Sequence, residues 1–159
     1  MIEGTLTATD YLAAQRLHQR RRFIIVCAIE ALFVVSAAVM LMLTNDPMAI
    51  FVFSGFLGLF ALVLLNWFIV LPRKSRRYAR QMKLDQLHIR LHWDDEALSS
   101  ASEQGQARKA WRDYVKSRAD QHIVLLYHAD NLFTMIPARW FDSEAQRAEF
   151  LRLAGKAGG

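Results

Sequence analysis

Two long apolar runs dominate the hydropathy pattern of the N-terminal half of the chain. They cover residues 23–44 and 48–71, which are 22 and 24 residues long, and an α-helix needs about 20 residues to cross the core of a bilayer. The polar segment Thr44-Asn45-Asp46-Pro47 separates them. Proline disfavours helix at the residue before it. The pattern therefore predicts two membrane-spanning helices that form an antiparallel hairpin.

From about residue 86 onward the apolar period changes to that of β-strands. Ile89, Leu91 and Trp93 alternate with polar residues, which is typical of a half-buried strand. Further candidate strands follow at residues 97–103, 107–111, 114–117, 122–128 and 132–136, with one turn at Gln104 and Gly105. A C-terminal helix is predicted from Asp142 or Ser143, with Gln146 placed for a capping box. It should end near Ala154 and bury Ala148, Phe150, Leu151 and Ala154.

The segments on either side of the apolar runs are also predicted to be structured. Residues 3–7 are expected to be extended, and a Thr7 to Asp10 capping signal begins a helix that runs into the first span. Residues 72–85 form a basic helix that continues the second span. A domain of about seventy residues has a thin core, so we expect it to borrow the N-terminal strand or to lean on the helices next to the membrane.

The predicted fold class is a membrane α-helical hairpin plus a small α+β cytoplasmic domain. In that domain antiparallel strands are capped by one C-terminal helix, an architecture of the pleckstrin-homology type. The predicted segments are an N-terminal strand and helix, the hairpin, the basic helix and the C-terminal domain, at residues 1–22, 23–71, 72–85 and 86–155.

The net charge of +5 gathers at the ends of the hairpin. Residues 72–83 hold six basic residues and no acid, whereas residues 84–159 hold ten basic residues and eleven acids. The positive-inside rule therefore predicts that both termini are cytoplasmic. The same side chains are expected to meet the anionic inner leaflet, and they are Arg20, Arg21, Arg22, Arg73, Lys74, Arg76, Arg77 and Arg80.

Polar residues within the apolar runs are few. Glu30 lies about 12 Å below Arg22 and Asn66 about 10 Å below Arg73, at about 1.5 Å per residue, so the two side chains are expected to face each other as an intramembrane pair. One interpretation is a proton or ion relay, or a contact with a partner helix. The other is a protonated Glu30 that bonds Asn66 and sets the helix register. Small residues such as Ser54 and Gly58 favour packing within the hairpin, with a homo-oligomer as the alternative.

Several features of the C-terminal part are similar to one known family. They include an acidic turn at Asp94, a turn at Gly105, the aromatic pair Trp111 and Tyr114, the apolar run 123–127, and a final group of Ile136, Pro137, Arg139 and Phe141 before an acidic helix. This pattern resembles the YcxB-like family of bacterial membrane proteins. That family also combines two spans with a cytoplasmic domain, so the resemblance covers nearly the whole chain. It implies a bacterial inner-membrane location and no known reaction.

Catalytic and cofactor motifs are missing from the sequence. It has no glycine-rich phosphate loop or GxSxG elbow, and the single cysteine, Cys27, lies within an apolar run. His88 and His92 in a strand lack the spacing of a helical metal site. Since the basic residues flank apolar spans, we also expect no binding of nucleic acid. We therefore expect no cofactor, no metal and no enzymatic activity.

The leading functional hypothesis is a non-enzymatic, membrane-anchored interaction or regulatory protein with an unknown protein partner. Exposed aromatic and arginine side chains dominate binding hot spots, which makes Trp111, Arg139 and Trp140 a candidate partner face; the alternative is that the two indoles belong to the core. The second hypothesis is a subunit of an oligomeric transport or proton-coupled assembly that uses Glu30.

Overall fold

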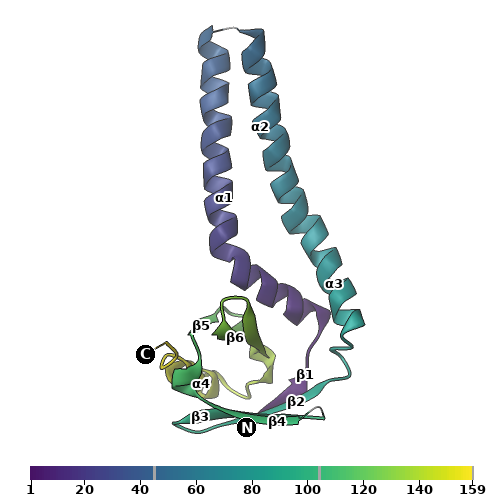
Figure 1. Cartoon of the computed structure of the whole chain (residues 1–159), viewed down its shortest axis with the longest axis vertical. Helices are drawn as coiled ribbons and strands as arrows, with labels where there is room; N and C mark the ends of the chain where they lie inside the picture. Colours follow the sequence, from purple (N-terminus) through teal and green to yellow (C-terminus); the bar gives the residue numbers. More distant parts are fainter. Residues whose placement is uncertain (45, 104, 159) are drawn as a thin grey trace. The chain divides into compact units, whose positions relative to one another are not determined.

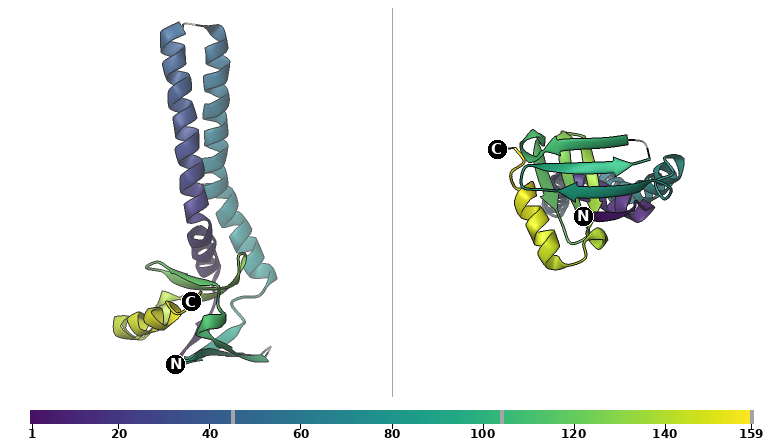
Figure 2. Two further views of the ribbon diagram at one scale, coloured as in Figure 1. Left: turned by 60° about the vertical axis from the view of Figure 1, so that its left-hand side comes forward. Right: turned by 90° about the horizontal axis from the view of Figure 1, so that it is seen from below.

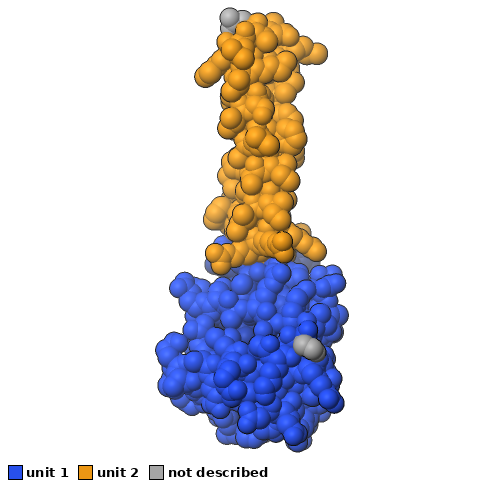
Figure 3. Space-filling view, turned by 90° about the vertical axis from the view of Figure 1, so that its left-hand side faces the viewer, with its two compact units in different colours: residues 1–18, 75–159 blue, residues 19–74 orange. Residues whose placement is uncertain are grey.

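The computed structural model describes residues 1–44, 46–103 and 105–158, and it divides into two compact units. One unit combines Met1–His18 with Ser75–Gly159, and the other is Gln19–Lys74 (Figure 3). The first unit is therefore built from both ends of the sequence. Asn45 and Gln104, which were expected in turns, lie outside the described residues.

The second unit is an antiparallel pair of long helices, as the apolar runs predict (Figure 1). It contains most of α1 (Ala8–Thr44), all of α2 (Pro47–Leu65), a π-helical turn at Asn66–Val70, and the start of α3 (Leu71–Gln81). Asp46 caps α2, because its carboxylate accepts a hydrogen bond from the Met48 N–H at 2.9 Å, and Pro47 takes the first helical position that suits it.

Both helical stretches, Ala8–Thr44 and Pro47–Gln81, are long and apolar enough to cross a membrane. Only 6% of the most apolar stretch of each is buried, so they are unlike the core helices of a soluble protein. Within the pair, Phe33 stacks on Phe56 with ring centres 4.9 Å apart. Gly55 and Gly58 have open space beside them, so the predicted close packing of Gly58 within the hairpin is wrong. The chain is a candidate membrane protein on these grounds.

The first unit contains two antiparallel sheets. Four strands follow one another in the order β1-β2-β3-β4, and three more in the order β5-β6-β7 (Figure 2). Their bounds are Ile2–Thr5, His88–Trp93, Ala97–Ser102, Gly105–Ala110, Lys116–Ala119, Ile123–Ala129 and Leu132–Pro137. Short 3-10 turns lie at Trp111–Asp113 and Ala138–Trp140, and α4 (Glu144–Ala154) closes the unit. The expected small domain of antiparallel strands with a C-terminal helix is confirmed.

The strand β1 completes a sheet whose other strands come from the far side of the hairpin. Ile2 pairs with Leu91 and Thr5 with His88 in an antiparallel ladder. Ile2 and Leu6 are both buried in the same core as Leu91. The expectation that the C-terminal domain borrows the N-terminal strand is thus confirmed.

The continuous apolar run of β6 is explained by burial on both faces. Ile123, Leu125 and Tyr127 pack against Ala14 and Leu17 in the first turns of α1. The alternate residues Val124 and Leu126 belong to the larger core between the sheets and α4. A strand covered on both faces has no reason to alternate with polar residues.

The helix ends form as the capping signals predict. At the start of α1 the Asp10 N–H donates to the Thr7 hydroxyl at 3.3 Å, and the Thr7 N–H donates to the Asp10 carboxylate at 2.8 Å. At α4 the Gln146 N–H donates to the Ser143 hydroxyl at 3.2 Å. Both arrangements satisfy N–H groups that the first turn leaves without partners.

The buried face of α4 differs in part from the expectation. Phe150 and Ala154 are buried as predicted, together with Leu153, which the pattern missed. Ala148 is exposed, so that prediction was wrong. At about 100° per residue, Ala148 lies about 200° around the helix from Phe150 and faces solvent. Phe150 instead fills the core, where its ring meets Trp111 edge-on at 5.4 Å.

Gly4 is required in β1 because the indole of Trp140 lies directly on it. A Cβ atom at position 4 would overlap the ring atoms of Trp140. Trp140 is 7% exposed and has little space to move. Glycine here provides close approach between β1 and the 3-10 turn after β7.

We expect Gly4→Ala to lower the free energy of unfolding by about 1–3 kcal/mol, the usual effect of overpacking. Thermal unfolding of the purified full chain in detergent would measure it, and Glu3→Ala on the exposed side of the same strand is the control. Equal stability of the two variants would show that Trp140 does not hold β1.

Candidate functional site

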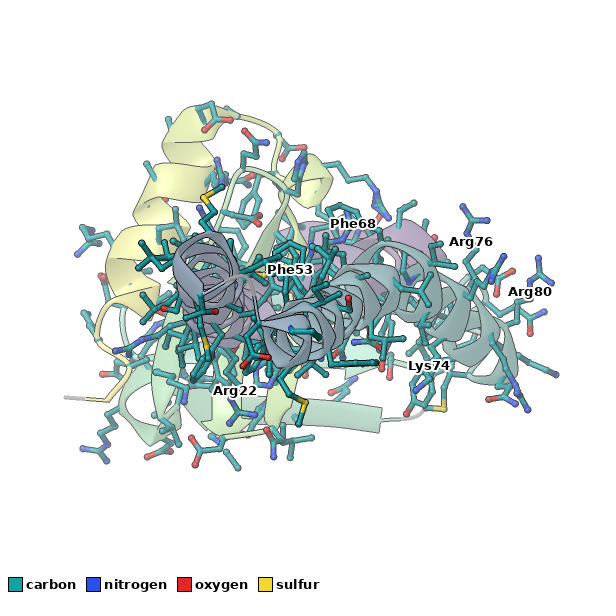
Figure 4. The ribbon with its side chains drawn as sticks, turned by 90° about the horizontal axis from the view of Figure 1, so that it is seen from above. Arg22, Phe53, Phe68, Lys74, Arg76 and Arg80 are labelled. Atoms are coloured by element: carbon teal, nitrogen blue, oxygen red, sulfur yellow. The ribbon has the colours of Figure 1, made fainter. Side chains whose placement is uncertain are left out.

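The basic residues predicted at the membrane surface are all exposed. Among the described residues, none of the eight forms an ion pair or a side-chain hydrogen bond with the protein. On α3 the buried side is formed by Ser75 and Ala79, and Arg76 and Arg80 extend outward from the helix (Figure 4). Their charges are therefore free to meet an external anion.

The predicted pair of Glu30 and Asn66 does not form a hydrogen bond. The Asn66 side chain is exposed, and Glu30 is partly buried with its Oε2 atom shielded and without a partner among the described residues. Trp67 takes the inward position instead and stacks on Phe23 at 4.0 Å. The two residues lie at different levels of the hairpin. Because Trp67 is level with Phe23, its neighbour Asn66 is about seven residues, or about 10 Å, from Glu30 along the helix axis. The prediction counted depth from Arg22 and Arg73 as if these two residues were level, and the stacked rings show that they are not.

Trp111 and Trp140 are buried, so they do not offer an exposed partner face. Trp111 is 1% exposed, and its indole N–H donates to the backbone carbonyl of Asp94 at 2.9 Å. The core alternative accounts for both indoles. Of the three residues, Arg139 alone reaches the surface, where it pairs with Asp10 at 2.6 Å.

Arg139 lines a groove in the first unit, between the start of α1, the β5–β6 turn and the turn after β7. We call it the Arg16 groove. Its volume is about 560 Å³, within the range of small-molecule and peptide pockets. The lining residues are Thr9, Asp10, Leu12, Ala13, Arg16, Asp120, Gln121, His122, Ala138 and Arg139.

The two carboxylates of the Arg16 groove are already engaged. Asp10 binds the Arg139 guanidinium and the Thr7 N–H. Asp120 accepts hydrogen bonds from the backbone N–H groups of His122 and Ile123, at 2.8 and 3.0 Å. Both acids therefore serve the local fold.

Arg16 is the group that the fold leaves unpaired. Its Nε atom is shielded from solvent without an acceptor among the described residues. A shielded donor without a partner is unfavourable by about 1–3 kcal/mol. An external carboxylate or phosphate at this point would remove that penalty, because a guanidinium binds such groups through two parallel hydrogen bonds. Sequence patterning gave no signal for Arg16, which stands singly in a helix.

Comparison with known families gives a match in the C-terminal part of the chain. Residues 93–154 match the family model described as YcxB-like protein. The chain carries a YcxB-like domain. Comparison with curated proteins found no match, and comparison with solved structures found none.

The YcxB-like segment begins at Trp93, the last residue of β2. It includes β3 to β7 and α4, and it leaves out β1 and both long helices. The match is thus shorter than the resemblance across nearly the whole chain that was expected. The residues that carried the resemblance have structural roles here: Asp94 closes the β2–β3 turn through the N–H groups of Glu96 and Ala97, and Trp111 bonds to that turn.

Titratable groups in the YcxB-like domain meet at His128. Its Nδ1 atom is 3.0 Å from the Lys109 ammonium, which can only donate, so Nδ1 accepts and Nε2–H donates to the Thr134 hydroxyl at 2.8 Å. Burial lowers the pKa of His128, and the charge of Lys109 lowers this pKa further. Neutral His128 thereby links β4 of one sheet to β6 and β7 of the other. In the described parts of the chain, no three metal-binding side chains lie together.

We expect the domain to lose stability as the pH falls below about 6.5, the ordinary His value. Because the folded-state pKa of His128 is depressed, the unfolded chain binds the proton first; the stabilisation is present above the unfolded pKa and is lost as the pH falls through the folded one. Thermal unfolding of the full chain at pH of about 7.5 and 5.5 would measure this.

His128→Gln, which cannot titrate, should reduce the difference in melting temperature between the two pH values. His122→Gln in the exposed β5–β6 turn is the control and should keep the wild-type difference. A full pH effect in His128→Gln would exclude His128 as its source.

Proposed function

We propose that the chain is a non-enzymatic interaction or regulatory protein anchored in the bacterial inner membrane by two spans. In this proposal both termini are cytoplasmic, and the folded unit presents the Arg16 groove to an acidic segment of a cytoplasmic protein. The observation that carries the proposal is the shielded, unpaired Nε atom of Arg16 in a groove whose own acids are engaged.

The topology is supported by the pairing of β1 with β2. These strands precede the first apolar helix and follow the second, and they share one ladder from Ile2–Leu91 to Thr5–His88. If both helices cross the membrane, this pairing requires that the two ends lie on one side. The free basic side chains of the flanks favour the cytoplasmic side, and they would also attract anionic lipid headgroups.

The pleckstrin-homology-type architecture is proposed from the strand order. The consecutive strands β2-β3-β4 and β5-β6-β7 form two antiparallel meanders, β1 adds an edge strand to the first of them, and α4 follows the second. Phe150 of that helix fills the core against Trp93 and Trp111. Such frames often present binding surfaces without any catalytic group, and this fits an interaction role by analogy alone.

Crosslinking in living cells would test the proposed function. A photoreactive amino acid in place of Gln121, which lines the groove and is exposed, should give a discrete adduct with an acidic segment of a cytoplasmic protein. Arg16→Ala in the same chain should lower the yield about tenfold or more, the loss expected for a charge-assisted hydrogen bond. Arg16 has no side-chain hydrogen bond or ion pair to lose within the described residues, so its removal should leave the fold intact.

Two comparisons make this experiment decisive. Arg16→Lys should restore part of the yield, and Arg112→Ala, whose exposed side chain lies outside the groove, should have no effect. A yield that is indifferent to Arg16 would contradict the role of the groove. An adduct with a periplasmic protein would contradict the topology.

A second candidate function, a subunit of an oligomeric proton-coupled assembly, is favoured by Glu30. Glu30 is partly buried in a candidate span, and its shielded Oε2 atom has no partner among the described residues. Because unsatisfied polar groups are unfavourable in lipid, this candidate function has a second chain contact the carboxyl group. One hairpin alone is too small to enclose a pathway.

For this candidate function we expect Glu30→Gln to shift the oligomeric state, measured by native mass spectrometry of the protein in nanodiscs. We also expect this variant to abolish proton-coupled uptake of the transported substrate by vesicles that contain the protein. Ser36→Ala is the control, since the Ser36 hydroxyl bonds within its own helix to the Leu32 carbonyl at 2.8 Å. Unchanged assembly and uptake in Glu30→Gln would exclude the relay.

A further inference from the structure

The outer face of the four-stranded sheet carries a trough that the proposed function does not use. The strand register sets the shape of the trough. Ser99 of β3 lies between His92 of β2 and Arg108 of β4, and Ala101 of β3 lies between Arg90 of β2 and Gln106 of β4. Small side chains on the middle strand therefore form a floor, and longer ones on β2 and β4 form two walls. Figure 2 shows these strands side by side in the view from below.

The trough has the size of a small-molecule site and a polar lining. Its volume is about 390 Å³, and pockets for small ligands begin at about 300 Å³. The lining residues include no carboxylate: they are Met1, Arg90, Leu91, His92, Ser99, Ser100, Ala101, Gln106, Ala107 and Arg108. Two guanidinium groups, an imidazole, two serine residues and an amide thus line the open space.

The two acids nearest to the trough are already paired, and one of them is paired with Arg108 of the trough itself. Glu3 stands opposite Arg90 in the register, but its carboxylate pairs with His88 at 3.4 Å. Asp94 pairs with Arg108 at 2.9 Å and also accepts the N–H groups of Glu96 and Ala97. Arg108 is thereby held at the rim.

Arg90 is the free cation of the trough. Among the residues that the structure describes, it has no ion pair and no side-chain hydrogen bond. Alternation along β2 places it on the outer, solvent side, and Leu91 on the inner side is fully buried. The trough therefore combines one free and one positioned guanidinium across a floor only two strand spacings wide, about 10 Å.

We propose that this trough binds a small molecule that bears a phosphate group. A terminal phosphate has three oxygens that accept from several directions at once, and it suits a site with more donors than one carboxylate can use. Arg90 and Arg108 would hold the phosphate oxygens from opposite walls, with the Ser99 hydroxyl on the floor and the Gln106 amide beside Arg108. The His92 imidazole completes the wall of β2.

Titration of the full chain in nanodiscs of neutral lipid would test the proposal. The probes are inorganic phosphate and glycerol phosphate, added at constant ionic strength with chloride as the reference anion. Wild-type protein should show saturable binding by calorimetry and a rise in melting temperature. Arg90→Ala should weaken binding about tenfold or more, as expected for loss of a charge-assisted hydrogen bond.

Matched variants separate the trough from general surface charge. Arg112→Ala removes an exposed guanidinium outside the trough and should leave affinity unchanged. Ser99→Leu fills the floor without removing a charge and should abolish binding. Because Arg90 has no side-chain partner in the described part of the chain, its replacement is not expected to unfold the domain.

A second arm distinguishes the source of the phosphate. Nanodiscs that contain phosphatidic acid should protect Arg90 from arginine-modifying reagents if the group belongs to a lipid, whereas protection by glycerol phosphate in neutral discs would assign a soluble ligand. Either result supports the proposal. The proposal is overturned if neither source protects Arg90, or if Arg90→Ala binds phosphate as tightly as the wild type.

Discussion

The ladder between β1 and β2 is the contact on which the rest of the folded unit depends. It joins residues 2–5 to residues 88–91, and it brings the buried Ile2 and Leu6 into the main core. The same connection positions the first turns of α1, whose Ala14 and Leu17 cover the far side of β6. Without β1, the four-stranded sheet would lose an edge strand and the three-stranded sheet would lose its cover.

Local sequence signals were sufficient to predict features that depend only on residues within one helix or strand. The capping residues at Thr7 and Ser143 formed the expected hydrogen bonds, and the alternation around Leu91 correctly marked a strand. The apolar run 123–127 indicated burial. The segments that pack on its two faces come from distant parts of the chain, and no local pattern predicts which segments they are. Ala148 was misplaced because the position of Phe150 in the core decides which side of α4 is buried.

The two proposed binding sites depend on relations that one sequence does not display. Arg16 matters because two acids beside it are engaged elsewhere, and those pairings arise from the turn at Asp120 and the cap at Asp10. The row of His92, Ser99 and Arg108 depends on the register of three strands. Conversely, Glu30 and Asn66 do not meet, because the packing of Trp67 on Phe23 sets the alignment of the two helices and leaves Asn66 about seven residues away from the level of Glu30.

The split of the folded unit around the hairpin also imposes an order of events during synthesis. Residues 6–87 must be made after β1 before its neighbour in the sheet exists, which takes about 4–16 s at roughly 5–20 residues per second. Both long helices are synthesised during that interval, before β2. In the proposed topology, a chain in which only one of the two helices crossed the membrane would leave β1 and β2 on opposite sides, and they could not pair. In that topology the four-stranded sheet can therefore be completed only after both helices have crossed the membrane.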